Sequence, residues 1–234
     1  MQSYPQLTST PTVSKVIKAH EKPISCIATH IRKKVLATGC DDATFKIYNM
    51  DNYEELGSGS GHTDYISGID IHPKGLFLAT CSGDTTININ DLSTGKNKTT
   101  YRDHKSIVWD VKFHDTGDFL LSCSDDNTIR LFDINMPKTR SIYYGHTDAV
   151  NKVNFQPFTN YFASCSADKT VSIWDMRLGL TVQTFYGHLN VVNDVVFNTR
   201  GDMLYSCDAD GVVKAWDIRK NKEMYIYLIK LIYI

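Results

Sequence analysis

Pairs of apolar residues three positions apart recur every 42 residues along the chain, and each pair starts a stretch rich in β-branched residues. The five pairs are Ile24/Ile27, Ile66/Ile69, Val108/Val111, Val150/Val153 and Val192/Val195. In a regular strand the residues of one face are two positions apart, so a spacing of three predicts a strand that carries a β-bulge.

Each repeat holds three further stretches with strand character. In the fourth repeat they are residues 161–166, residues 170–174, where β-branched and aromatic residues alternate, and residues 181–186. The polar segment at Asp168 between the first two of these is typical of a tight turn. The pattern predicts an all-β protein with four short strands per repeat.

Polar residues keep the same register without a single insertion. A histidine starts each repeat, an aspartate stands 22 residues later, and a hydroxyl residue stands 18 residues later. The histidines are His20, His62, His104, His146 and His188. The position 28 residues after the histidine holds Tyr48, Asn90, Phe132, Trp174 and Trp216. Such a fixed period indicates a repeat architecture.

With Gly-His early and Trp-Asp late in the repeat, the sequence resembles the WD40 family of β-propellers. The residues that carry the resemblance are Gly61-His62, Gly145-His146, Gly187-His188, Trp174-Asp175 and Trp216-Asp217. The resemblance implies five recognisable four-stranded blades over residues 13–228, with a first strand at 13–18. We expect residues 1–12 to be a disordered segment and residues 229–234 to be an aberrant apolar tail.

Members of the resembled family have seven repeats, so we expect an incomplete seven-blade ring. A sixth histidine would fall at position 230, where Lys230 stands. A truncated chain, which we favour, a strained five-blade ring and a ring completed by another chain remain open. Exposed blade edges would favour self-association.

The repeated polar residues form sets that resemble the structural tetrad of WD40 blades. The two complete sets are His146, Ser164, Asp168, Trp174 and His188, Ser206, Asp210, Trp216. The alternative is a Ser-His-Asp hydrolase triad. Fivefold repetition favours structure over catalysis, so we expect no enzyme and no catalytic residue.

Metal and cofactor sites are not expected. The histidines outside the first repeat position, His30, His72 and His114, are again 42 residues apart, and equivalent residues of different blades cannot converge on one ion. The repeated cysteines should pack between blades as free thiols. They are Cys81, Cys123, Cys165 and Cys207.

Charge and composition add exclusions. The chain has 25 basic and 26 acidic side chains and a net charge of -1, which gives no basic patch for nucleic acid and no attraction to an anionic membrane. It lacks a membrane-spanning apolar run and a signal-peptide pattern, so we expect a cytoplasmic protein.

Loop-proximal positions of the narrow face supply the expected protein-binding surface. They hold Asp41, Tyr65, Trp109, Asp125, Asn151 and Asn193. Trp109 stands where other repeats carry Ser or Asn, and it either anchors a partner or fills the wall between blades.

Several segments also look like the sperm-associated antigen 16 family of axonemal proteins. They are residues 80–86, 144–148, 157–160, 164–170, 172–175, 206–212 and 214–220. The resemblance implies a microtubule-associated, non-catalytic scaffold of the ciliary or flagellar central apparatus, needed for assembly or motility. Its partners would be other central-apparatus proteins. The alternative is a generic WD40 adaptor or substrate receptor in a ubiquitin-ligase or signalling complex.

Overall fold

Five antiparallel four-stranded sheets make up the structure, which is a computed structural model that describes residues 16–220 and 222–228. We call each sheet a blade, and within each blade the strands pair in chain order. Blade one contains β1 (Ile24–His30), β2 (Val35–Cys40), β3 (Thr44–Asn49) and β4 (Glu55–Ser60), with a short 3-10 helix η1 (Ile31–Lys33) after β1. Blade two contains β5 (Ile66–Ile71), β6 (Phe77–Ser82), β7 (Ile87–Asp91) and β8 (Asn97–Tyr101).

The remaining blades repeat this order. Blade three contains β9 (Val108–Phe113), β10 (Phe119–Ser124), β11 (Ile129–Asp133) and β12 (Thr139–Tyr143). Blade four contains β13 (Val150–Phe155), β14 (Tyr161–Ser166), β15 (Val171–Asp175) and β16 (Leu180–Phe185). Blade five contains β17 (Val192–Phe197), β18 (Met203–Asp208), β19 (Val212–Asp217) and β20 (Lys222–Leu228).

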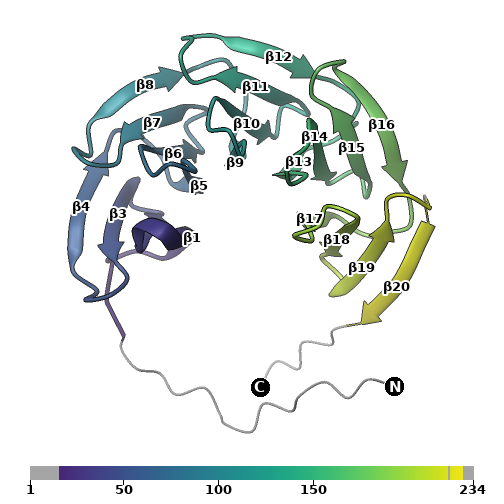
Figure 1. Cartoon of the computed structure of the whole chain (residues 1–234), viewed down its shortest axis with the longest axis horizontal. Helices are drawn as coiled ribbons and strands as arrows, with labels where there is room; N and C mark the ends of the chain where they lie inside the picture. The colour runs from purple at the N-terminus through teal and green to yellow at the C-terminus, as the bar shows by residue number, and fades with distance from the viewer. Residues whose placement is uncertain (1–15, 221, 229–234) are drawn as a thin grey trace, which may run out of the picture.

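The blades stand around a central opening, with the first strand of each nearest the centre and the fourth at the rim (Figure 1). The ring is open between blade five and blade one. The all-β prediction is therefore confirmed, and no closed ring is formed by the described residues. The strand predicted at 13–18 is wrong for its described part, since residues 16–18 belong to no strand. The predicted segments 1–12 and 229–234 lie outside the described residues.

The predicted bulge in the first strand is confirmed in every blade. The pairing between the first and second strands skips one residue directly after the first apolar residue of the pair. In blade two this shift lies between Ile66 and Gly68, and in blade four it lies between Val150 and Lys152. The extra residue lies opposite no partner in the ladder, which turns its side chain toward the neighbouring blade.

The hydrophobic core is divided into four clusters, one between each pair of neighbouring blades. Between blades two and three, for example, Cys81 and Ile87 of one blade pack with Val108, Val111 and Leu120 of the next. The other three clusters have the same construction. Burial of apolar surface between blades is thus the main force that holds consecutive blades together.

In one cross-strand pair of blade one, the large and the small side chain have changed places relative to the other blades. In blades two, three and four an aliphatic residue of the third strand faces an aromatic residue of the fourth; these pairs are Ile87/Tyr101, Ile129/Tyr143 and Val171/Phe185. In blade one Phe45 faces Gly59, and a Cβ atom on Gly59 would collide with the Phe45 ring. The Phe45 ring therefore occupies the space that the aromatic side chain of the fourth strand fills in blades two to four.

Candidate functional site

The predicted tetrad of blade four is joined by three hydrogen bonds. Trp174 Nε1 donates to Ser164 Oγ at 2.8 Å, Ser164 Oγ lies 2.7 Å from His146 Nε2, and His146 Nδ1 lies 2.7 Å from Asp168 Oδ2. Because the Asp168 carboxylate can only accept, the ring proton of His146 stays on Nδ1, and Ser164 donates its own proton to Nε2 while it accepts the bond from Trp174. Burial acts against the ionisation of Asp168, but the bonds from His146 and Thr170 outweigh it and lower its pKa.

Blade five uses a different aspartate from the predicted one. His188 Nδ1 lies 2.8 Å from Asp208 Oδ2, whereas Asp210 is exposed and accepts a bond from Asn190 Nδ2 at 2.8 Å. Two substitutions explain the change. Asp208 stands where blades two to four have a serine, and Val212 replaces the threonine whose hydroxyl holds the aspartate in the other blades. The predicted tetrad with Asp210 is therefore wrong, and Asp208 is its fourth member.

The first three blades form the His–hydroxyl–Asp part without tryptophan. In blade two Asn90 Nδ2 donates to Thr80 Oγ1 at 3.5 Å, so it supplies a long version of the tryptophan bond. In blade three the Phe132 ring fills the position and donates nothing, and in blade one Tyr48 bonds the carbonyl oxygen of Ala19.

The geometry of these sets resembles a hydrolase triad, but their surroundings favour a structural role. Ser164 and Ser122 are fully buried, and the indole of Trp174 covers Ser164 from the other side. A nucleophile must reach a substrate carbonyl, and no substrate reaches an oxygen enclosed in this way. The network satisfies buried polar groups and holds each blade's loops to its strands.

In blades one, two and four the side chain at the bulge of the first strand donates a hydrogen bond to the next blade. Ser25 donates to the carbonyl oxygen of Ile66, Ser67 donates to that of Val108, and Asn151 Nδ2 donates to that of Val192 at 2.8 Å. Asn151 was expected in the protein-binding surface, but its amide is used inside the ring. In blade five the equivalent Asn193 is exposed and forms no side-chain hydrogen bond among the described residues.

A second recurring bond involves the histidines outside the tetrads. His30 Nε2 bonds the carbonyl oxygen of Pro73, His72 Nε2 that of Gly117, and His114 Nε2 that of Thr159, each in the next blade. In blade four Gln156 Nε2 bonds Gly201 O at 2.5 Å. Each of these side chains links its blade to the next, and the carbonyl groups that they contact lie in four different blades.

Blades one and five each expose, on one side, a surface that in the other blades is buried against a neighbouring blade. Ile24 and Ile27 of blade one are 46% and 64% exposed, whereas their equivalents in blade two, Ile66 and Ile69, are buried. On blade five, Val196 and Tyr205 are exposed beside a hollow of about 200 Å³. The equivalents of Tyr205 in the other blades, Ala37, Ala79, Leu121 and Ala163, are buried core residues, as are those of Ile24 and Ile27. We call these two surfaces the open faces.

Three of the predicted protein-binding residues come together on the edge that carries the tetrad loops. Tyr65 is half-buried against Gly83, and burial raises its pKa, with the negative charges of Asp64, Asp125 and Asp41 adding to the effect. All three aspartates are exposed, and they belong to blades one to three. We call Tyr65 with Asp41, Asp64 and Asp125 the acidic patch; such an arrangement suits a basic partner segment.

Trp109 is half-buried, and its ring packs on the core between blades three and four. Its Nε1 is buried without a hydrogen-bond partner within the described part of the chain. It therefore fills the wall between two blades, and only its exposed edge is available to a partner.

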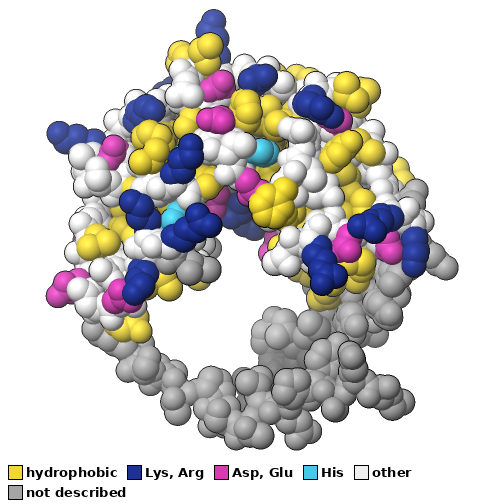
Figure 2. Space-filling model, viewed as in Figure 1, with side chains coloured by type: hydrophobic (Ala, Val, Ile, Leu, Met, Phe, Trp, Pro, Cys, Tyr) yellow, Lys and Arg dark blue, Asp and Glu magenta, His cyan; other side chains and the backbone are white. Residues whose placement is uncertain are grey.

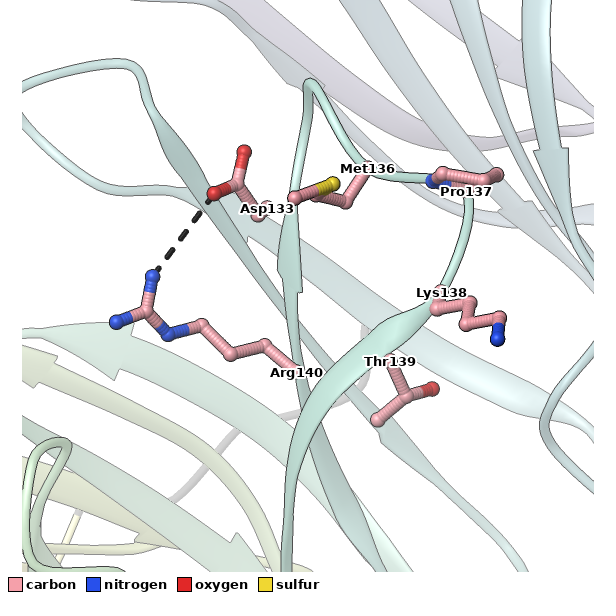
Figure 3. Close-up of a pocket in the computed structure, with 6 residues that line it drawn as sticks. All are labelled: Asp133, Met136, Pro137, Lys138, Thr139 and Arg140. Atoms are coloured by element: carbon pink, nitrogen blue, oxygen red, sulfur yellow. Dashed lines mark ion pairs between the residues drawn. The ribbon is translucent and has the colours of Figure 1, made fainter.

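A surface pocket of about 470 Å³ lies at the turn between β11 and β12 (Figure 3). Arg140 points to Asp133 at 3.8 Å, and Met136, Pro137 and Lys138 form an exposed rim. Its two central charges neutralise one another, so it lacks the converging polar groups of a small-molecule site. Lysine and arginine side chains are spread around the face seen in Figure 2, without one dominant cluster.

Among the described residues no helix is long and apolar enough to span a membrane. The mouse protein named "Sperm-associated antigen 16 protein" is 43% identical over 56 residues, which are 24% of this chain and 9% of that protein. The match thus spans a small part of either chain. The family profile described as "WD domain, G-beta repeat" matches five segments, residues 11–49, 53–91, 95–133, 137–175 and 179–217. These matches cover most of the sequence, and the chain belongs to the WD40 repeat family, whose members are generally non-catalytic and bind other proteins.

Proposed function

We propose that the chain is a non-catalytic protein-interaction scaffold of the ciliary or flagellar axoneme, where it serves assembly or motility of the central apparatus. The observation that supports binding is the acidic patch: an aromatic ring half-buried against Gly83, with exposed carboxylates of three blades whose charges act on it. A rigid aromatic residue within a ring of charge is a common arrangement for a protein-binding surface.

The partner of this surface is a basic segment of another axonemal protein. Tyr65 supplies apolar contact area, and Asp41, Asp64 and Asp125 attract lysine or arginine side chains and speed their association. The axonemal setting is supported by the partial likeness to the mouse protein and by the family resemblance of the repeat segments.

The second function, an adaptor or substrate receptor in a ubiquitin-ligase or signalling complex, would use the same surface. Localisation separates the two. A tagged chain expressed in a flagellated cell should remain with the axoneme after detergent extraction. Recovery of all the protein in the detergent-soluble fraction would remove the axonemal proposal and favour the adaptor.

A further inference from the structure

We propose that His20, Cys40 and Asp42 of blade one form a binding site for a divalent zinc ion. One ligand atom from each of these residues, an imidazole nitrogen, a sulfur and a carboxylate oxygen, lies within 4.8 Å of the other two. Ligands at about 2.0–2.3 Å from a tetrahedral zinc ion lie about 3.3–3.8 Å apart, so small side-chain movements bring the set to the metal.

The donor chemistry suits zinc. A neutral imidazole, a thiolate and a carboxylate are zinc ligands, and the two anions balance the charge of the ion. Binding releases the Cys40 thiol proton to solvent, and a water molecule completes the four ligands. The other blades lack this set, because the position of Cys40 is held by Ser82, Ser124, Ser166 and Asp208.

The tautomer of His20 is free to change, unlike that of His146. In blade four the Trp174 N–H donates to Ser164, and the Asp168 carboxylate, 2.7 Å from Nδ1, keeps the ring proton on that nitrogen, so Ser164 donates to Nε2. In blade one Tyr48 bonds Ala19 O instead, and Thr38 Oγ1 lies 3.4 Å from the carbonyl oxygen of Lys46, to which it can donate. Thr38 can therefore accept the Nε2 proton of His20 at 2.9 Å, which frees Nδ1 for the metal.

The cluster is also the loosest and most open of its kind. His20 Nδ1 and Asp42 Oδ2 are 3.3 Å apart, against 2.7–3.0 Å for the equivalent pairs of blades two to four. The Asp42 side chain is 27% exposed, against 7–9% for those of its equivalents. The main-chain N–H and the hydroxyl of Thr44 both donate to Oδ1 of Asp42, which leaves Oδ2 on the side of His20 as a ligand for the ion. The exposure of Asp42 gives the ion a route from solvent.

The test is a titration of the reduced, chelator-treated chain with cobalt(II), which binds zinc sites and absorbs light when a thiolate is bound. We expect a thiolate-to-cobalt band that saturates at one equivalent and disappears when zinc is added. Cys40→Ser installs the residue of blades two to four, so it should fold and lose the band. Cys26→Ser, a cysteine of the same blade outside the cluster, should keep it.

A second variant guards against misfolding. Asp42→Asn keeps the thiol, and its zinc affinity, measured by competition with a chelator, should fall at least about tenfold. Zinc should also raise the unfolding midpoint of the wild type and leave that of Cys40→Ser unchanged. The absence of a saturating band in the wild type, or its persistence in folded Cys40→Ser, would overturn the proposal, as would unchanged zinc affinity in folded Asp42→Asn.

Discussion

Trp174 Nε1 donates a 2.8 Å hydrogen bond to Ser164 Oγ, and both side chains are buried. It completes a chain of bonds in which Ser164 donates to His146 Nε2 and His146 Nδ1 donates to the Asp168 carboxylate. The network therefore ties the loop before the first strand, which carries His146, to the second and third strands of its blade.

Replacing Ser164 by Ala should lower the free energy of unfolding by about 1–3 kcal/mol, because it leaves the Trp174 N–H and His146 Nε2 buried without a partner. Urea unfolding measures the change, with Ser60→Ala, at an exposed position of β4, as control. Unchanged stability together with loss of a hydrolytic activity would contradict the structural assignment.

The two aspartates of blade five should differ in their effect on stability. Asp208→Ala removes the partner of His188 and two main-chain bonds from Asp210 and Val212, so it should destabilise the chain by about 2–4 kcal/mol. Asp210→Ala removes an exposed contact with Asn190 and should change stability by less than about 0.5 kcal/mol. Equal effects in thermal unfolding would mean that the carboxylate of Asp210 shares the role.

The repeat positions alone could not predict that Asp208 replaces Asp210 as the partner of His188, because a prediction from the repeat assumes that equivalent positions have equivalent partners. Asp210 keeps its repeat position, yet its neighbours changed: Val212 offers no hydroxyl, and Asp208 brings a second carboxylate within reach of His188. The comparison of positions 208 and 212 with the other repeats was the available signal.

By contrast, the period predicted the strands, the bulges and the packing of Cys81, Cys123 and Cys165 between blades, because these depend on the local pattern of each repeat. The same prediction is wrong for Cys207, which is half-buried beside the hollow of blade five. The bridging roles of Asn151 and His72 were not predictable, since they depend on main-chain carbonyl groups of the following blade. The sequence of one repeat does not reveal where those carbonyls lie. The cluster of His20, Cys40 and Asp42 was not predictable from the repeat either, because it depends on a cysteine at position 40 whose equivalents in the other repeats are Ser82, Ser124, Ser166 and Asp208.

The exchange between Phe45 and Gly59 predicts strong coupling. Gly59→Tyr alone should destabilise blade one by at least about 1–3 kcal/mol, since the new tyrosine side chain collides with the Phe45 ring. Phe45→Ile alone leaves a cavity and should cost about 1–3 kcal/mol. The double variant reproduces the Ile87/Tyr101 pair of blade two and should recover most of the loss. A double-mutant cycle with no coupling would contradict this packing.

Stability should fall with pH in two steps. Burial lowers the pKa of His72 and His104 below the ordinary value of 6.5, so the unfolded chain binds protons first, and stability declines as the pH falls below about 6.5. Burial opposes the ionisation of Asp42, but bonds from Thr44 prevail and lower its pKa to about 2. Its stabilisation is complete above about pH 4 and is lost as the pH falls toward 2.

The contribution of His72 to the loss of stability below about pH 6.5 can be measured with a substitution that copies the equivalent residue of blade four. His72→Gln keeps a donor for Gly117 O, as Gln156 does for Gly201 O, and removes one titrating group. The slope of unfolding free energy against pH between 7 and 5 should become smaller. An unchanged slope would show that His72 does not contribute to it.

The central claim is that the acidic patch binds an axonemal partner, and retention of variants on detergent-extracted axonemes tests it most directly. The test variant combines Tyr65→Ala with Asp125→Asn, and the control combines Tyr144→Ala with Asp148→Asn, which are exposed at the same edge of blade four. Both should fold as the wild type does, as judged by circular dichroism. We predict that the wild type and the control stay with the axoneme, and that the patch variant is released at least about tenfold more, equivalent to about 1.4 kcal/mol of binding energy. Equal retention of the patch variant and the control would contradict the account.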